Sequence, residues 1–276
     1  KKLYSIKPLS ISHKDYTTVC SATKTIFIDG SIQVVGERIN PTGKKALKNA
    51  LKNMDMRYIL REAIEQQKLG ADILDINVGI PEIDETITME RIVKGIQGIL
   101  DTPLQIDSVD PETIERAVRV YNGKPIINSV TGDMKTMETI FPIVKKYGTN
   151  VIGLTMDENG LPSSWQERCD ICKKILDVAE SFGIDKNNII IDCLTLTASV
   201  NQEQAFETIK AIKKIKETYG VKTILGVSNI SFGLPRRELL NRTFLIMAMT
   251  YGLDMPILDP KDEEMIDLVK AFRVLS

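Results

Sequence analysis

The sequence alternates between short apolar runs and longer segments in which apolar residues recur at helical spacing. The apolar runs occupy residues 32–36, 73–77, 104–107, 125–128, 150–154, 188–192, 223–227 and 255–258. The helical segments that follow them occupy residues 55–69, 87–100, 110–120, 134–147, 164–182, 202–219, 237–251 and 261–275. Strict alternation favours a parallel sheet, because parallel strands need crossover helices. Eight such repeats in one chain predict a closed (β/α)₈ TIM barrel.

Residues that favour helix ends mark several of these boundaries. Asp55 is suited to cap the helix that Gly70 ends, and Asp110 followed by Pro111 is typical of a helix start. Ser164 is expected to cap a later helix. No G-x-G-x-x-G sequence follows any of the apolar runs, so an open dinucleotide-binding sheet lacks its main sequence signal. The closed barrel is therefore favoured over open sheets.

The length of the chain fits one barrel with a short extension. Barrels of this class take about 200–250 residues, and this chain has 276. Residues 1–31 show no long periodicity and contain Ser, Thr, Pro and mixed charge, so we expect an N-terminal extension that links the barrel to a preceding module. Residues 32–276 are expected to form the barrel.

Charge and hydropathy argue against several classes of partner. The net charge is −1 and the pI is about 6.1, which does not suit a nucleic-acid partner. No apolar run approaches the roughly 18 residues of a membrane span, and residues 1–5 do not lead into a signal-peptide core. We therefore expect a cytoplasmic protein without a membrane partner.

The cysteines and the histidine do not indicate a metal site. Cys169 and Cys172 match a C-x-x-C pattern, but they lie in a helical segment without a second pair or a nearby histidine. We interpret that pattern as incidental. The only histidine, His13, lies in the extension, so a histidine base or ligand cluster in the barrel is not expected. No metal is predicted.

Acidic and amide residues recur where the predicted strands end, which in a barrel is the face that carries the chemistry. Asp75, Asp107, Asn128 and Asp192 each end an apolar run directly, whereas a helix cap stands one position before a helix. For Asp157, a turn is the preferred interpretation. The full set at these ends is Glu37, Arg38, Asn40, Asp75, Asn77, Asp107, Asn128, Asp157, Asp192, Ser228 and Asn229.

These residue types suit two kinds of ligand. Several carboxylates without histidine or cysteine could hold a hard cation such as Mg²⁺ through oxygen ligands. They could equally bind a heterocycle rich in N–H donors, such as a reduced pterin, while the amides serve its mixed donor and acceptor positions. The residues alone leave both possibilities open.

Five segments, taken together, resemble the pterin-binding methyltransferase family. They are Val-Gly-Glu-Arg-Ile-Asn-Pro-Thr-Gly at 35–43, Leu-Asp-Ile-Asn-Val-Gly at 74–79, Gln-Ile-Asp at 105–107, Ile-Asn-Ser at 127–129 and Gly-Val-Ser-Asn-Ile-Ser-Phe-Gly-Leu-Pro at 226–235. The resemblance covers residues 32–276 and is strongest to the folate-binding domain of cobalamin-dependent methionine synthase. One departure is Asp192-Cys193-Leu194, where relatives often carry Asp-Pro-Gly.

The resemblance implies a fold, a ligand and a reaction. It implies a (β/α)₈ barrel that binds 5-methyltetrahydrofolate and passes the N5 methyl group to Co(I) of cobalamin, which another domain supplies. Arg237 is expected to line the site, with Arg236 as the alternative. The predicted pterin and folate contacts are Glu37, Asn40, Asp75, Asn77, Asp107, Asn128, Asp192, Ser228, Asn229 and Arg237.

The chemistry of the implied reaction assigns a catalytic role to Asn229. N5 of methyltetrahydrofolate is a poor leaving group unless it gains a proton, so the site must favour positive charge there. We expect the Asn229 side chain to stabilise the N5-protonated form by hydrogen bonding, while the proton comes from solvent.

The expected partners are other domains of the same enzyme. The chain carries neither an Asp-x-His-x-x-Gly corrinoid sequence nor a cysteine set for activating homocysteine. We therefore expect it to act with the cobalamin-binding domain and the homocysteine-binding module of methionine synthase. A free-standing methyltetrahydrofolate:corrinoid protein methyltransferase is the alternative.

Three further functions are less favoured. A dihydropteroate synthase would grip phosphate near the last strand with a short Arg and His motif, whereas this chain reads Leu258-Asp259-Pro260-Lys261 there. A Mg²⁺-dependent carbon–carbon lyase would lose its activity on chelation. A non-catalytic folate carrier would not pass a methyl group to Co(I) in a single turnover.

Overall fold

The computed structural model describes residues 15–276, and its central element is a closed barrel of parallel strands. The strands are β3 (Val35–Ile39), β4 (Ile73–Asn77), β5 (Leu104–Asp107), β6 (Ile126–Thr131), β7 (Asn150–Leu154), β8 (Ile189–Asp192), β9 (Lys222–Gly226) and β10 (Met255–Leu258). The sheet closes because β10 pairs with both β9 and β3. The predicted (β/α)₈ TIM barrel is thus confirmed. Residues 1–14, which include His13 and part of the predicted extension, lie outside the described residues.

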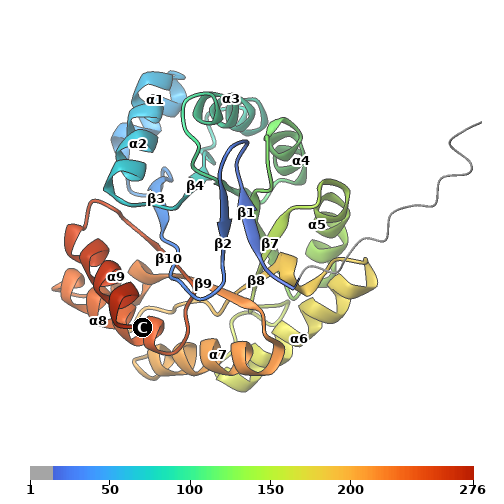
Figure 1. The fold of residues 1–276 in the computed structure, drawn as a ribbon, viewed down its shortest axis with the longest axis vertical. Coiled ribbons are helices and arrows are strands. Elements are labelled where there is room, and N and C mark those ends of the chain that lie inside the picture. Colours follow the sequence, from blue (N-terminus) through green and yellow to red (C-terminus); the bar gives the residue numbers. More distant parts are fainter. Residues whose placement is uncertain (1–14) are drawn as a thin grey trace, which may run out of the picture.

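Helices form a ring around this barrel (Figure 1). They are α1 (Lys45–Lys52), α2 (Met56–Leu69), α3 (Glu85–Gln97), α4 (Pro111–Val120), α5 (Met134–Tyr147), α6 (Trp165–Ser181), α7 (Glu203–Tyr219), α8 (Arg237–Thr250) and α9 (Glu263–Leu275). Short 3₁₀ helices lie at Lys186–Asn188 (η2) and Val227–Ser231 (η3). The apolar sides of the ring and the outward sides of the strands share one core cluster.

The predicted helix ends are confirmed by their capping contacts. The Asp55 side chain accepts a hydrogen bond from the Tyr58 amide, and Gly70 ends α2 in the left-handed region. The side chain of Asp110 accepts from two amides at the start of α4, directly before Pro111. These contacts satisfy amide groups that a helix leaves unpaired at its first turn.

Two strands, β3 and β6, have a boundary that differs from the prediction by more than one residue. β3 begins and ends three residues later than expected, so Glu37 and Arg38 lie within the strand and not after it. The charged pair Glu37-Arg38 is typical of the end of a strand. In the structure, the Arg38 guanidinium lies between the barrel and α2, where it pairs with Glu62 and Asp259 at 2.7 Å each. β6 runs past Asn128 to Thr131, because a shift in its register with β7 lets the pairing continue.

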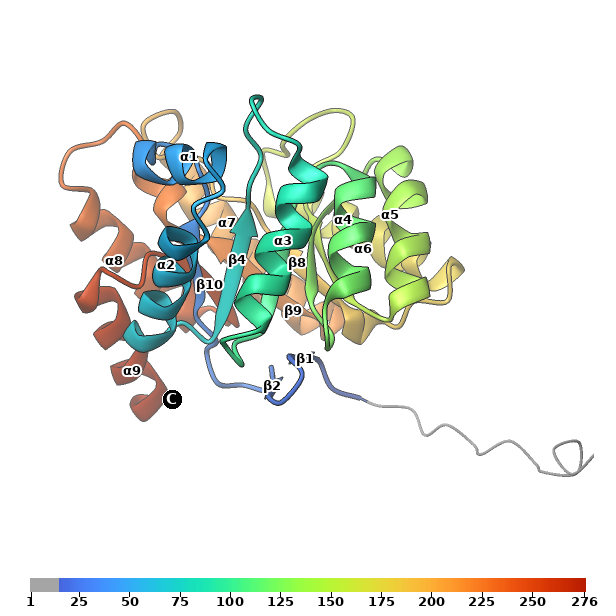
Figure 2. The same ribbon diagram turned by 90° about the horizontal axis from the view of Figure 1, so that it is seen from above.

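A two-stranded hairpin that the sequence pattern did not predict closes the amino-terminal end of the barrel. Its strands are β1 (Thr18–Cys20) and β2 (Thr25–Phe27), which pair antiparallel. Figure 2 shows the hairpin at one end of the barrel and the loops that lead into α3 and α6 at the other. Val19, Ile26 and Ile28 join the apolar cluster inside the barrel. The opposite, carboxyl-terminal end is therefore the open one.

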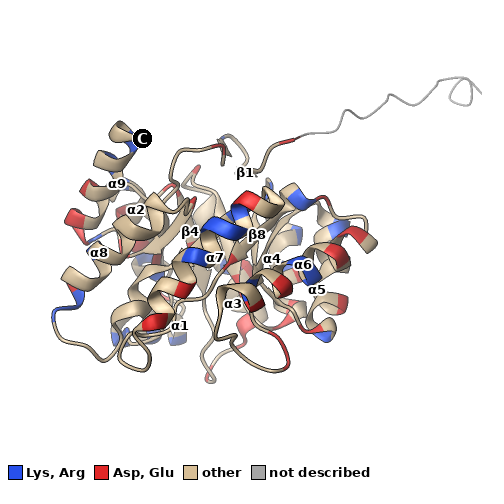
Figure 3. Ribbon diagram, turned by 90° about the horizontal axis from the view of Figure 1, so that it is seen from below, with Lys and Arg blue, Asp and Glu red and all other residues tan. Residues whose placement is uncertain are grey.

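The outer surface shows no single-sign face. Figure 3 shows basic and acidic residues interspersed along the outer helices, which agrees with the net charge of −1. Over the described range of the chain, no helix combines the length and the apolar character that a membrane span requires.

Candidate functional site

The inside of the barrel consists of an apolar layer and a polar layer. The apolar layer consists of Val35, Ile73, Ile126, Ile152, Ile190, Ile224 and Met255. Because alternate residues of a strand face the same way, the residue two positions further on also faces inward. On β3, β4, β6 and β8 that residue is Glu37, Asp75, Asn128 and Asp192. These side chains are thereby brought together above an apolar floor. Asp75 stands in the middle of β4 and not at its end as predicted, because the pairing with β5 continues to Asn77.

Strand register places the predicted residues of β4, β5 and β6 side by side. Asn77 pairs with Asp107, and Asp107 pairs with Asn128. The Asn77 amide nitrogen donates to the Asp107 carboxylate at 3.0 Å. One level lower, Gln105 donates to Asp75 at 2.6 Å. These residues therefore form one connected group of acids and amides on adjacent strands.

Gln105 belongs to this group although the sequence did not single it out. Its side chain is fully buried, and its Oε1 atom has no hydrogen-bond partner among the described residues. The signal was present in the alternation, because Gln105 stands two residues before Asp107 and so shares its face. A lone polar residue inside an apolar run predicts by itself only a strand.

Burial governs the ionisation of the two acids in this group. Burial raises the pKa of Asp75 well above its usual range, and the nearby Asp107 carboxylate raises it further. Burial also raises the pKa of Asp107, against the opposing effect of the hydrogen bond from Asn77. Two acids that resist ionisation favour a ligand that brings N–H donors to them.

Asp192 stands across the barrel on β8 and is also buried. Burial raises its pKa to about 7, although the Leu194 amide donates to its Oδ1 atom at 2.7 Å and acts in the opposite direction. Its side chain points inward, two residues after Ile190 of the apolar layer. The carboxyl group can therefore exchange its proton near neutral pH.

Glu37 connects β3 with the loop that follows β9. The Ser228 hydroxyl donates to its carboxylate at 3.3 Å. Burial raises the pKa of Glu37, and the half-buried Lys44 ammonium opposes that shift. Lys44 was not predicted as a site residue; its ammonium donates to the backbone oxygens of Glu37 and Asn40 at 3.0 and 3.3 Å. The Asn40 side chain itself accepts from the Thr42 amide at 3.0 Å, within its own turn.

Asn229 lies in η3, directly after β9, and is exposed. Gly226 occupies the inward position of β9, two residues after Ile224. A Cβ atom at Gly226 would lie 3.1 Å from the Asn229 amide nitrogen. Because Gly226 has no side chain, the Asn229 carboxamide can lie against the inner wall of the barrel at this position.

Arg237, at the start of α8, holds η3 in position. Its guanidinium donates to the Ser231 hydroxyl and to the Ser228 carbonyl, both at 3.0 Å. Arg236 precedes the helix in the left-handed region and is exposed. Of the two alternatives, Arg237 is the one that contacts the loop carrying Asn229.

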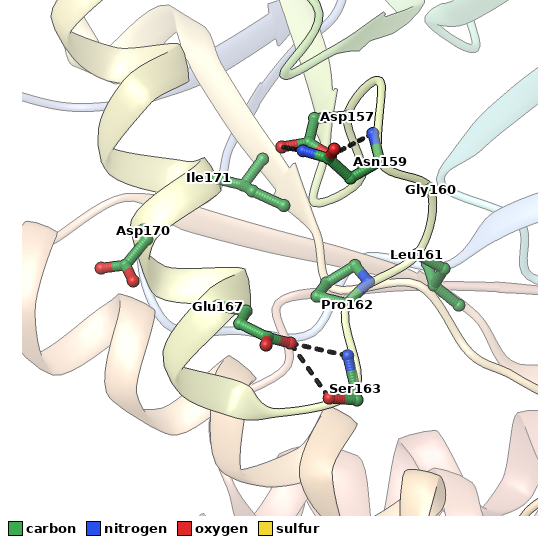
Figure 4. Close-up of a pocket in the computed structure, with 9 residues that line it drawn as sticks. All are labelled: Asp157, Asn159, Gly160, Leu161, Pro162, Ser163, Glu167, Asp170 and Ile171. Carbon is green, nitrogen blue, oxygen red and sulfur yellow. Dashed lines mark hydrogen bonds between the residues drawn. The ribbon is translucent and has the colours of Figure 1, made fainter.

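Some polar residues near the strand ends lie apart from this group. The turn interpretation of Asp157 is confirmed, because its side chain accepts from the Asn159 amide at 2.9 Å within a turn closed by Gly160. Figure 4 shows Asp157 at the edge of a hollow of about 430 Å³, between its loop and α6. None of the predicted pterin and folate contacts lines that hollow. Within the described residues, no three acid, histidine or cysteine side chains are grouped as metal ligands.

Comparisons with known proteins show the family of this chain. Residues 36–259 match the family described as pterin binding enzyme. The chain is 32% identical over 259 residues to methionine synthase of Mycobacterium leprae, covering 88% of this chain and 21% of that protein. It is 30% identical over 243 residues to methylcorrinoid:tetrahydrofolate methyltransferase of Eubacterium limosum, covering 86% of this chain and 89% of that protein.

Solved structures share the fold at lower identity. A dihydropteroate synthase of Xanthomonas albilineans matches with a TM-score of 0.74 and 18% identity, over 94% of this chain and 98% of that one. At that identity the likeness concerns the fold alone. This chain spans about a fifth of the length of the mycobacterial methionine synthases that it matches.

Proposed function

Since the chain belongs to the pterin binding enzyme family, we propose that its polar inner layer binds the pterin ring of 5-methyltetrahydrofolate and that the chain moves the N5 methyl group to a corrinoid. The observation that carries this proposal is the connected group of Asp75, Gln105, Asn77 and Asp107, with Asp192 across the barrel. A pterin ring is flat and apolar on its faces but has N–H donors along one edge. The apolar floor suits the face, and the buried acids suit the edge.

The raised pKa values support a donor-rich ligand. In the free protein, burial disfavours the charged forms of Asp75, Asp107 and Asp192. N–H donors from a bound ring would hydrogen-bond the charged carboxylates and favour them. Part of the binding free energy would thus come from stabilising carboxylates whose charged forms are destabilised by burial in the free protein.

Asn229 is proposed to act on the reacting nitrogen. Its carboxamide has a place on the inner wall beside Gly226, yet the residue is exposed, so a ligand atom there can be reached from outside. The amide can accept a hydrogen bond from protonated N5, and this stabilises the positive charge on which methyl loss depends. N5 keeps the electron pair of the broken N–CH₃ bond. A corrinoid bound to a partner supplies the Co(I) nucleophile that accepts the methyl group.

Two settings of this activity are open, and each has its own support. The mycobacterial relatives are long proteins named methionine synthase, which favours one module among several, with a cobalamin-binding domain and a homocysteine-binding module as partners. The Eubacterium limosum relative is matched over 89% of its length and is named for transfer between a methylcorrinoid and tetrahydrofolate. It favours a free-standing methyltransferase that meets a corrinoid protein.

The end of β10 favours methyl transfer over dihydropteroate synthesis. Lys261 lies 2.7 Å from Glu65 and 3.6 Å from Glu62, and Asp259 pairs with Arg38. The two cations there are already paired with acids, so they are poorly placed to hold a diphosphate.

A titration followed by a single-turnover experiment tests the proposal. The protein should bind 5-methyltetrahydrofolate in a calorimetric titration and then, mixed with Co(I) cobalamin, should remove the Co(I) absorbance in a stopped-flow trace. Binding without loss of Co(I) would indicate a folate carrier. Failure to bind the folate at all would contradict the proposal.

A further inference from the structure

The turn at the end of β8 is held at three successive backbone carbonyls, those of residues 192–194. The Asp192 carbonyl accepts from the amide and the hydroxyl of Thr155, at 3.0 and 3.1 Å. The Leu194 carbonyl accepts from the Thr208 hydroxyl at 3.1 Å. Leu194 has a φ of +54°, in the left-handed region that favours glycine. A leucine keeps that conformation only where its surroundings enforce it.

The third carbonyl, that of Cys193, is held by an arginine that is completely buried. Arg168 is 0% exposed, and its Nε atom donates to the Cys193 carbonyl at 2.9 Å. Its other donors go to the Ser164 carbonyl at 3.2 Å and the Gln204 side-chain oxygen at 2.9 Å. All three partners are neutral oxygens. Burying a guanidinium without a carboxylate in direct contact is costly, so its presence here calls for a reason beyond packing.

The position of Arg168 is fixed by the start of α6. Ser164 caps the helix and Glu167 completes the capping box, so Arg168 lies in the first turn. Figure 4 shows the Glu167 carboxylate turned back to Ser163, whose amide donates to it at 2.8 Å. Gln204 in turn donates to the Ser163 carbonyl at 2.6 Å. Arg168 therefore ties the loop after β7 and the first turn of α7 to the loop after β8.

We propose that Arg168 is a positioning residue, which fixes the Asp192 carboxylate in the barrel by holding Cys193 and Leu194 in their strained loop. The inference rests on the proposed function, because it takes Asp192 as a pterin contact. The Leu194 amide that donates to Asp192 belongs to the strained residue itself. The carboxylate is thus directed inward only as long as the loop keeps this conformation.

Three variants test this role by the affinity for 5-methyltetrahydrofolate. Arg168→Met should raise the Kd about tenfold or more, because a misplaced Asp192 carboxylate would lose a charged hydrogen bond to the pterin, and the loss of such a bond weakens binding by about that factor. Adding Leu194→Gly to it should restore part of the affinity, because glycine adopts the left-handed conformation without help. Lys173→Met, on the exposed side of α6, is the matched control and should leave the Kd unchanged.

The outcomes separate positioning from fold stability. A purely structural Arg168 would lower the melting temperature without changing the Kd of the folded protein, and that result would overturn the inference. A raised Kd that Leu194→Gly does not lower would overturn it as well. If Arg168→Met does not fold, Thr208→Val removes only the contact to the Leu194 carbonyl. It should then weaken binding severalfold, and an unchanged Kd would count against the inference.

A ligand-free measurement separates this inference from the proposed function. The Leu194 amide resonance should follow the ionisation of Asp192, with a midpoint near pH 7. In Arg168→Met the midpoint should rise, because the released loop weakens the Leu194 hydrogen bond that favours the charged carboxylate, and loss of a nearby cation acts in the same direction. The carboxylates that act on Arg168 are those of Glu207 and Glu167, and both are present in the wild type and in the variant. If the wild-type chain does not bind the folate, the proposed function fails. An unchanged midpoint would then overturn the positioning role separately.

Discussion

The two layers inside the barrel are built from the same strands but have opposite properties. The lower layer is apolar, fully packed and closed by the β1–β2 hairpin. The upper layer, further along the strands, holds four acids whose pKa values are raised by burial, namely Glu37, Asp75, Asp107 and Asp192. The lower layer stabilises the fold, whereas the upper layer costs stability in the free protein. That cost is expected where side chains await a ligand.

The contrast implies that a change in the lower layer acts on stability and a change in the upper layer acts on function. The two layers are successive inward positions along the strands, so single substitutions can change one layer without the other. The largest expected effect belongs to the lower layer, and the smallest to the helix surfaces outside the barrel.

Truncation of the floor should cost stability alone. Ile28 is fully buried and packs from the hairpin segment into the barrel. Ile28→Ala should lower the free energy of unfolding by about 2–5 kcal/mol, through lost burial and the cavity left behind. Urea unfolding measures the loss. The Kd for 5-methyltetrahydrofolate at low temperature should be unchanged. A higher Kd would contradict the separation of stability and function between the two layers.

Removal of the amide at the rim should act on the rate. Asn229→Ala should lower the rate of methyl transfer to Co(I) by about 10²–10³, because a preorganised partner of the reacting nitrogen is lost. Stability should be unaffected, since the side chain is exposed. Stopped-flow single turnovers measure the rate, with Asn159→Ala in the outlying turn as the control. An unchanged rate would remove Asn229 from the mechanism.

Neutralising an upper-layer acid should stabilise the free protein in a pH-dependent way. The folded pKa of Asp192 is about 7, above the ordinary value of about 3.9. The folded state therefore disfavours the charged form, and the cost is absent below about pH 4, grows up to pH 7 and is constant above it. Asp192→Asn should thus be more stable than the wild type by about 2–4 kcal/mol at pH 8 and equal to it near pH 4. Urea unfolding at both pH values checks this. A constant difference between the two proteins would contradict the burial of a titrating carboxyl.

Charges outside the barrel should matter least. Lys173 pairs with Asp177 one turn along α6, with both side chains mostly exposed. Lys173→Ala should change the free energy of unfolding by less than about 0.5 kcal/mol and leave the folate Kd alone. A larger loss of stability in a thermal melt would show that surface ion pairs contribute more to the free energy of unfolding than we expect.

Local patterns in the sequence predict most of the fold. β4 and β5 begin and end where the apolar runs do, and the caps at Asp55 and Asp110 are where residue preferences put them. The hairpin was missed because strands of three residues carry too little periodicity to stand out. The start of β3 was misplaced because the partners that satisfy Arg38 are distant in the sequence.

The site was only partly visible in the sequence for a related reason. Acids that end apolar runs, such as Asp107 and Asp192, could be listed from strand ends alone. Gln105 shares the inward face of Asp107 by alternation, but its contact with Asp75 depends on the neighbouring strand. The role of Lys44 also arises from the partners that the fold brings to it. The inward place of Asn229 likewise depends on the absence of a side chain at Gly226, which only the folded chain shows. The assignment of these residues to a pterin stays a prediction.

The most direct test of the upper layer compares two aspartates, one that ends β5 and one that lies after β7. Asp107 lies in the upper layer and accepts a hydrogen bond from the Asn77 amide. Asp157 lies in the turn after β7 and accepts from the Asn159 amide. The Kd for 5-methyltetrahydrofolate should rise about 10- to 100-fold in Asp107→Asn, because one charged hydrogen-bond acceptor is lost. It should stay at the wild-type value in Asp157→Asn. Equal affinities for the two variants would contradict the claim that the inner layer binds the pterin.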